Sequence, residues 1–225
     1  MDQEAKATVL VYPGLEFKET EKSAGRYAKI LGLPRRRFTT VINSARWKTP
    51  EKIETVEQKK TRIRQEIIDA AKTSGRPVGI VAVSGSGPLL TEVTHGLDKE
   101  TVGAFATIAS PLDAAGLTFD ALPITLQDKL RIQSPVFVTF ATQLMNDGMS
   151  KLTDDEIHRM LNVYGTRDLS VSPEYSGLKG ANNQQFWTPY MPGKAGKLLS
   201  HAYNIARGLK TPQLKKFLTD KLQQS

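Results

Sequence analysis

The run PVGIVAVSGSGPLLTEV, from Pro77 to Val93, constrains the fold of this chain more than any other stretch. It begins as an apolar segment of β-strand type, reaches Ser84 and continues through small residues into a helical pattern. A sharp strand-to-helix turn holds its serine in a strained backbone conformation, and its flanks must be small so that strand and helix can approach closely. Ala82 and Ser86, two residues to either side of Ser84, are both small. The pattern predicts a strand that presents Ser84 as a nucleophile.

Two other interpretations of this turn stay open. Glycines usually stand two residues to either side of such a nucleophile, and here Ala82 and Ser86 replace them, with Gly85 and Gly87 adding freedom. A glycine-rich turn after a strand also suits phosphate binding. However, GSGPLL has leucine where a dinucleotide fingerprint needs its third glycine, and no Lys-Ser or Lys-Thr pair follows. A phosphate cradle and a plain tight turn are therefore the alternatives.

Composition limits the class of protein. With 225 residues, 39% of them hydrophobic, the chain can bury one sizeable core, so we expect residues 1–225 to form a single domain. No uninterrupted apolar stretch approaches the length of a membrane span, and the N-terminus lacks the basic and then apolar segments of a signal peptide. We therefore expect a cytoplasmic protein without a membrane span. The chain has no cysteine, which excludes disulfides, thiol catalysis and cysteine-ligated metals.

Basic residues outnumber acidic ones, which gives a formal net charge of +8. They concentrate in residues 35–37, 59–64 and 194–221. This excess favours acidic partners, but no aromatic residues are interleaved to stack on bases, so nucleic acid is not the expected partner. The sequence does not predict the oligomeric state or a role for this basic surface.

Runs of β-strand type alternate with helical patterns along the chain. The expected strands are Ala7–Tyr12, Phe38–Asn43, Val78–Val83, Val102–Ala109, Leu161–Gly165 and Gln184–Trp187. The expected helices are Pro50–Thr73, a short one that starts at the capping-box pattern Thr153–Glu156 and ends near Met160, Leu198–Gly208 and Gln213–Leu222. Strands that are apolar on both faces and alternate with helices predict a three-layer αβα sandwich with a mostly parallel sheet of about six strands.

A doubly wound strand order 2-1-3-4-5-6 would place the ends of the first and third strands side by side. Open α/β sheets bind ligands in the crevice at that point, so Tyr12–Glu16 and Ser84 would face each other there. Residues 110–133 follow the fourth strand and form the least regular part of the chain. They are interpreted either as a small cap over the crevice or as an ordinary packed connection.

Four motifs, in this order, resemble the α/β-hydrolase superfamily, in a short version that begins at what would be the third strand of the family. They are YPGL (Tyr12–Leu15), AVSGS (Ala82–Ser86), ATIASPL (Ala106–Leu112) and VYGTRDLSVSPE (Val163–Glu174). The resemblance covers about Ala7 to Leu209. It implies a serine nucleophile at Ser84 and an oxyanion hole built from the backbone N–H groups of Gly85 and Leu15.

The same resemblance makes Asp168 the candidate acid, with a turn or cap residue as the alternative, and Asp113 a second candidate. The family places its histidine in the loop before the final helix, where this chain has Lys194. Of the three histidines, His95 and His158 fall in helical stretches that are poorly suited to reach Ser84. His201 follows the expected position by seven residues and is the candidate base, unless it points at solvent. Lys194 could replace it only if burial strongly lowered its pKa.

Three functions follow from these residues. The first is a serine hydrolase that cleaves an ester, thioester or amide through an acyl-enzyme at Ser84, with His201 as base, Asp168 as its partner and no cofactor. The candidates to line an acyl pocket, with ordinary core packing as the alternative, are Phe137, Phe140, Met145, Met149 and Trp187. The second is a catalytically inactive protein that binds a small molecule in the same crevice. The third is a phosphate or nucleotide binder. Three scattered histidines with no paired-carboxylate motif predict no metal site.

Overall fold

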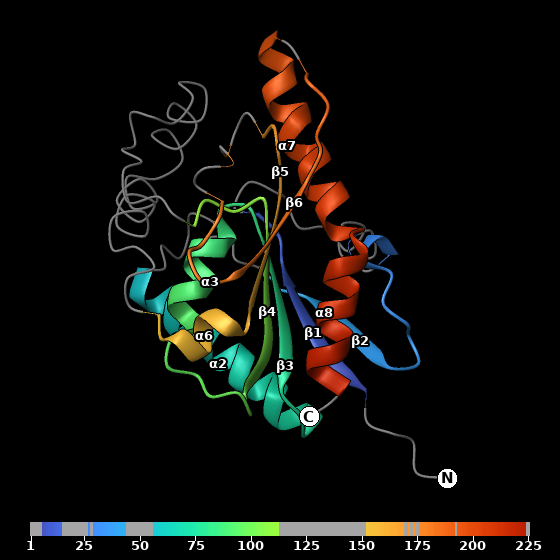
Figure 1. Cartoon of the computed structure of the whole chain (residues 1–225). Helices are drawn as coiled ribbons and strands as arrows, with labels where there is room; N and C mark the ends of the chain where they lie inside the picture. Colours follow the sequence, from blue (N-terminus) through green and yellow to red (C-terminus); the bar gives the residue numbers. More distant parts are fainter. Residues whose placement is uncertain are drawn as a thin grey trace, which may run out of the picture.

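Six parallel strands form the centre of the protein, as the computed structural model shows (Figure 1). The model describes residues 6–14, 27, 29–43, 56–112, 152–168, 171, 173, 176–191 and 193–223. The strands are β1 (Ala7–Tyr12), β2 (Phe38–Ile42), β3 (Val78–Val83), β4 (Val102–Ile108), β5 (Met160–Gly165) and β6 (Asn182–Phe186). Their order is β2-β1-β3-β4-β5-β6, and every neighbouring pair is parallel. The predicted fold class and strand order are confirmed.

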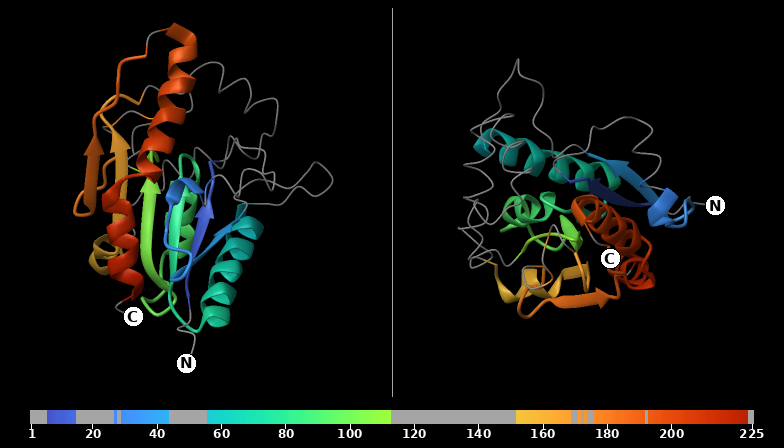
Figure 2. Two further views of the ribbon diagram at one scale, coloured as in Figure 1. Left: turned by 90° about the vertical axis from the view of Figure 1, so that its right-hand side faces the viewer. Right: turned by 90° about the horizontal axis from the view of Figure 1, so that it is seen from above.

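Helices cover both faces of this sheet (Figure 2). They are α2 (Val56–Ser74), α3 (Ser86–Thr94), α6 (Asp154–His158), α7 (Gly193–Leu209) and α8 (Pro212–Gln223). Alternate strand residues feed two separate apolar clusters, because successive side chains of a strand point to opposite faces. Val81 and Val83 pack with α7 and α8, whereas Ile80 and Ala82 pack with α2 and α3. This burial on both faces explains why β3 is apolar throughout.

Several predicted element ends were wrong by a few residues. Strand β4 ends at Ile108 because Ala109 takes a left-handed backbone conformation (φ +50). Strand β6 begins at the polar residue Asn182, two residues before the predicted start at Gln184. A hydrogen bond from Asn162 Nδ2 to Asn183 Oδ1 (2.9 Å) joins this polar start to β5. Helix α6 ends at His158, and Met160 belongs to β5. The predicted start of the long helix, at Pro50, and residues 113–133 of the candidate cap lie outside the described residues.

The predicted start of the next-to-last helix, at Leu198, was also wrong. Helix α7 begins at Gly193, so Lys194 lies inside the helix rather than in a preceding loop. Apolar periodicity marks only the part of a helix that contacts the core. Figure 1 shows the N-terminal half of α7 projecting beyond the carboxyl ends of the strands.

Helix α3 lies directly against the residues that follow β4. A Cβ on Gly87, in the first turn of α3, would collide with the Cβ and Oγ of Ser110. Ser110 is itself buried, with 1% of its surface exposed. Gly87 therefore sets how closely α3, which starts just after Ser84, can approach the sheet.

We expect Gly87→Ala to lower the free energy of unfolding by about 1–3 kcal/mol, the usual cost of overpacking a buried contact. Denaturant unfolding measures this change. In the double variant Gly87→Ala with Ser110→Gly the colliding atoms are gone, and most of the loss should be recovered. A single variant as stable as the wild type would contradict the close approach.

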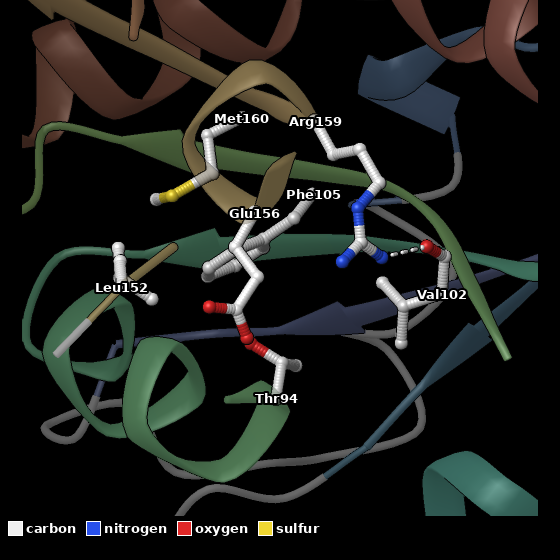
Figure 3. A pocket seen from close by; sticks show the side chains of 7 residues that line it. All are labelled: Thr94, Val102, Phe105, Leu152, Glu156, Arg159 and Met160. Atoms are coloured by element: carbon white, nitrogen blue, oxygen red, sulfur yellow. Dashed lines mark hydrogen bonds between the residues drawn. The ribbon is translucent and has the colours of Figure 1, made fainter. Parts of the chain in front are cut away.

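Glu156 joins α6 to the end of α3 near the amino ends of β4 and β5. Its carboxylate accepts hydrogen bonds from the backbone N–H groups of Thr153 (2.8 Å) and Gly96 (2.7 Å), and Thr153 and Glu156 form the predicted capping box. Burial opposes its ionisation, but these bonds, with others from the Thr153 hydroxyl and His95, outweigh burial and lower the pKa of Glu156 to about 2. Figure 3 shows Glu156 beside Arg159 in the small hollow that both residues line.

The Glu156→Gln variant should unfold more easily than the wild type at pH 7, by about 1–3 kcal/mol, because it lacks the ionised acceptor. Since folding lowers this pKa from 4.5 to about 2, the stabilisation is complete above pH 4.5 and disappears as the pH falls toward 2. Denaturant unfolding at a series of pH values tests this. Glu100→Gln, at an exposed position, is the control and should change little at any pH. A difference between Glu156→Gln and wild type that does not shrink on acidification would contradict the prediction.

Candidate active site

Ser84 follows the last residue of β3 and has a left-handed backbone conformation (φ +54). Its N–H donates to the carbonyl of Ile108 (2.8 Å), and its carbonyl accepts from the N–H of Gly87 (3.0 Å). The turn is thus tied to the end of β4 on one side and leads into α3 on the other. For a residue with a Cβ this conformation costs about 1–2 kcal/mol, so the surrounding contacts hold it in place.

Ser86, in the place where a glycine was expected, is fully buried and bonds the turn to its surroundings. Its Oγ accepts from the N–H of Val83 (2.8 Å) and lies within 2.8 Å of the carbonyls of Val83 and Tyr12, to one of which it donates its proton. The sequence showed only that this residue is small. Its hydroxyl also connects the turn at Ser84 to the end of β1.

The loop after β1 passes beside Ser84. A Cβ on Gly14 would lie 3.1 Å from the Cβ and 3.6 Å from the Oγ of Ser84. Gly14 therefore faces Ser84, as predicted for this residue of Tyr12–Glu16. Gly85 is one of the two expected oxyanion donors. It is the N-cap of α3, where the backbone N–H groups have no partner within the helix and point away from its N-terminus. Leu15 lies outside the described residues.

His201 connects Ser84 to Asp168. Its Nε2 lies 2.8 Å from Ser84 Oγ, and its Nδ1 lies 2.8 Å from Asp168 Oδ2. The other carboxylate oxygen of Asp168 accepts from the N–H of Val171 (3.0 Å). An ionised carboxylate can only accept, so Nδ1 carries the proton and, in the neutral ring, Nε2 is left to accept the serine hydroxyl. Ser84, His201 and Asp168 thus form a continuous series of hydrogen bonds.

The environment of this trio is mostly closed to solvent. The side chain of Asp168 is 2% exposed and that of His201 is 13% exposed. Hydrogen bonds between buried partners are stronger than in water and hold their members in one orientation. His201 lies two turns from the start of α7, deeper in the helix than the sequence suggested. The helix thus brings a histidine to the serine, although Lys194 occupies the position where the family resemblance placed one.

The two other histidines are not brought to Ser84. His95 caps the far end of α3, and its Nδ1 lies 3.2 Å from Glu156. His158 is the last residue of α6, and Trp187 is 66% exposed. The remaining candidates lie outside the described residues: Asp113, Phe137, Phe140, Met145 and Met149.

Two further searches cover only the described parts of the chain. In them no group of three histidine or carboxylate side chains is arranged to hold a metal ion. Among the described helices, none combines the length and the apolar character needed to cross a bilayer.

No protein-family model and no curated protein sequence matches the chain. Solved structures do match. The lipase BlEst2 of Bacillus licheniformis in its mature form superposes with a TM-score of 0.62 at 14% identity, over 97% of this chain and 93% of the other. The chain has the α/β-hydrolase fold.

Two other structures with this fold match to a similar extent. A hydrolase from Oleispira antarctica gives a TM-score of 0.61 at 13% identity, over 96% of this chain and 92% of that protein. An α/β-hydrolase fold protein from Nakamurella multipartita gives a TM-score of 0.56 at 16% identity, over 97% of this chain and 93% of that protein. At these identities the likeness concerns the fold, and the chemistry must be argued from the site.

The left-handed conformation at Ser84 makes a stability prediction with a defined sign. Glycine adopts this conformation without penalty, so we expect Ser84→Gly to exceed Ser84→Ala in free energy of unfolding by about 0.5–1 kcal/mol. Thermal and denaturant unfolding measure the difference. The matched control is the same pair of substitutions at Ser74, the last residue of α2. Because glycine is a poorer helix former than alanine, Ser74→Gly should be less stable than Ser74→Ala. The same order at both positions would contradict a strained turn at Ser84.

Proposed function

We propose that the protein is a serine hydrolase that cleaves an acyl ester, thioester or amide, with Ser84 as nucleophile, His201 as general base and Asp168 as the partner of His201. One observation carries the proposal. The imidazole of His201 lies within 2.8 Å of both Ser84 Oγ and Asp168 Oδ2, through different ring nitrogens. A base must lie about 2.6–3.2 Å from the proton it removes, and His201 meets this requirement.

The proposed reaction follows from this geometry. Ser84 Oγ attacks the acyl carbonyl carbon while His201 Nε2 takes the hydroxyl proton, and the buried carboxylate of Asp168 stabilises the imidazolium through the Nδ1 proton. The Gly85 N–H, with that of Leu15 as the proposed second donor, stabilises the negative oxygen of the tetrahedral intermediate.

Collapse of this intermediate breaks the bond to the leaving group, which takes the proton from His201 Nε2 and departs as an alcohol, thiol or amine. Water then gives a proton to His201 and attacks the acyl carbon. The resulting intermediate releases the acid and restores the Ser84 hydroxyl. Every proton transfer uses side chains of this chain, so the proposed reaction needs no cofactor.

Esters are the substrate class that we favour. Structures with the same fold include a lipase from Bacillus licheniformis and an acetyl ester-xyloside bifunctional hydrolase from Caldicellulosiruptor lactoaceticus. Alcohols also leave more readily than amines, so an ester makes the smallest demand on His201 as acid. The inactive-binder alternative rested on Lys194 at the expected histidine position. The contact between His201 and Ser84 supports the hydrolase instead.

A fluorophosphonate probe, which reacts covalently with activated serines, tests the proposal. We expect the wild type to be labelled, Ser84→Ala not to be labelled, and His201→Ala to react about 10³-fold more slowly because the hydroxyl then stays protonated. Asp168→Asn should slow labelling by about 10²–10⁴-fold, since the amide favours the wrong tautomer of His201.

His95→Ala is the matched control, because His95 also contacts a carboxylate but lies far from Ser84 along the fold. Its labelling rate should equal that of the wild type. Unlabelled wild type, or equal labelling of Ser84→Ala, would overturn the proposed function.

A further inference from the structure

Helix α7 is fixed to the end of β5 by a buried polar junction, formed by Gly165, Thr188 and Asn204. Thr188 and Asn204 are both 0% exposed, and Thr188 Oγ1 donates to Asn204 Oδ1 over 2.7 Å. Both side chains lie over Gly165, the last residue of β5, where a Cβ would collide with Asn204 Oδ1 and Thr188 Oγ1. The junction therefore depends on a glycine at the strand end and a hydrogen-bonded pair above it.

The junction also holds the segment that carries Asp168. The N–H of Thr188 donates to Thr166 Oγ1 (3.0 Å), and the N–H of Thr166 donates to the carbonyl of Phe186 (2.9 Å). Thr166 lies two residues before Asp168 in the chain. One set of hydrogen bonds thus connects α7 to the loop that supplies the carboxylate partner of His201.

His201 and Asn204 lie three residues apart on α7 and so share one face of the helix. The backbone of a histidine in a loop can adjust to its partners, but the backbone of a histidine inside a helix moves only with the helix. Both hydrogen bonds of His201 measure 2.8 Å, so a small slip of α7 along or around its axis would break their alignment. Misplacement of a catalytic group by about 1 Å can cost about 10²-fold in rate.

The chemistry of Asn204 indicates a role beyond packing. Its Nδ2 is buried and has no hydrogen-bond partner among the described residues. A buried donor without a partner destabilises a fold, and an apolar side chain of similar size would avoid that cost. Asparagine at this position is therefore best explained by what its Oδ1 does, which is to bind Thr188.

We propose that Asn204 is a positioning residue: through Thr188 it fixes α7 on the end of β5 so that His201 reaches both Ser84 and Asp168. This inference rests on the proposed function, because it concerns how the serine and its base are aligned. Asn204 acts through His201 and need not touch the substrate.

The chain contains a matched control for this test. Thr107 Oγ1 donates to Asn162 Oδ1 over 3.0 Å, and these residues are 1% and 0% exposed. The hydrogen bond and the burial match those of Thr188 and Asn204, although Asn162 Nδ2 also donates to Asn183 Oδ1. However, Asn162 alternates with Leu161 and Val163, which pack with α7 and α8, so it points to the opposite face of the sheet.

Steady-state hydrolysis of p-nitrophenyl butyrate measures the effect on the reaction. We expect Asn204→Ala and Thr188→Val to lower kcat by about 10–100-fold with little change in KM, because alignment rather than binding is lost. Thr188→Ser keeps the hydroxyl and should recover most of kcat. Asn162→Ala and Thr107→Val should lose melting temperature to a similar extent but keep the wild-type kcat.

Equal kcat values for Asn204→Ala and wild type would overturn the inference, and so would an equal fall of kcat in Asn162→Ala. If Asn204→Ala does not fold, the comparison of Thr188→Val with Thr188→Ser decides in the same way. A valine variant as active as the serine variant would overturn the inference.

A second readout does not depend on activity. In protein labelled with 15N at histidine, the nitrogen shifts of His201 report which ring nitrogen carries the proton. We expect the fixed Nδ1–H form in the wild type and in Asn162→Ala, and a mixture of both tautomers in Asn204→Ala. If the wild type neither hydrolyses esters nor reacts with the probe, the proposed function fails. These spectra still decide the positioning role: an unchanged Nδ1–H form in Asn204→Ala overturns it, and a mixture supports it.

Discussion

The hydrogen bonds of the His201 imidazole are the contacts on which the site depends. They join the turn after β3, the loop after β5 and the middle of α7, three elements far apart in the sequence. A parallel sheet places the carboxyl ends of its strands at one edge, which brings Ser84 and Asp168 to the same side of the fold. The imidazole must then come from an element that passes next to that edge. In this chain α7 carries the imidazole of His201 to that position.

The turn at Ser84 shows how the fold maintains a strained conformation. The left-handed backbone of Ser84 is held between the carbonyl of Ile108 and the start of α3. Ser86 replaces a glycine without crowding the turn, because its hydroxyl binds the ends of β3 and β1. Gly87 then allows α3 to lie against Ser110. Strain at one residue is thus supported by several contacts, as is common where a side chain must be exposed for chemistry.

The position of the histidine links the fold to the proposed chemistry. With Lys194 in the first turn of α7, the imidazole comes from two turns further along, and its placement is a property of the whole helix. Hydrogen bonds are directional, so a polar contact between a helix and its neighbours restricts the position of the helix along and around its axis. The buried pair of Thr188 and Asn204 supplies directional contacts close to His201. The same chain uses a similar pair, Thr107 and Asn162, on the other face of its sheet.

The sequence by itself determined the sheet and the tight turn at Ser84, because both follow from local patterns: apolar strands such as Val78–Val83 bounded by turns, and small residues around Ser84. Asp168 became a candidate through the family resemblance of Val163–Glu174. The polar start of β6 and the pairing of Thr188 with Asn204 were not predictable, since they depend on hydrogen bonds between different segments of the chain. The start of α7 was missed because no apolar periodicity marks it. Whether His201 faced Ser84 or solvent was decided by the tertiary structure alone. The direction of a side chain on a helix depends on how that helix packs, and no local pattern around His201 encodes the position of Ser84.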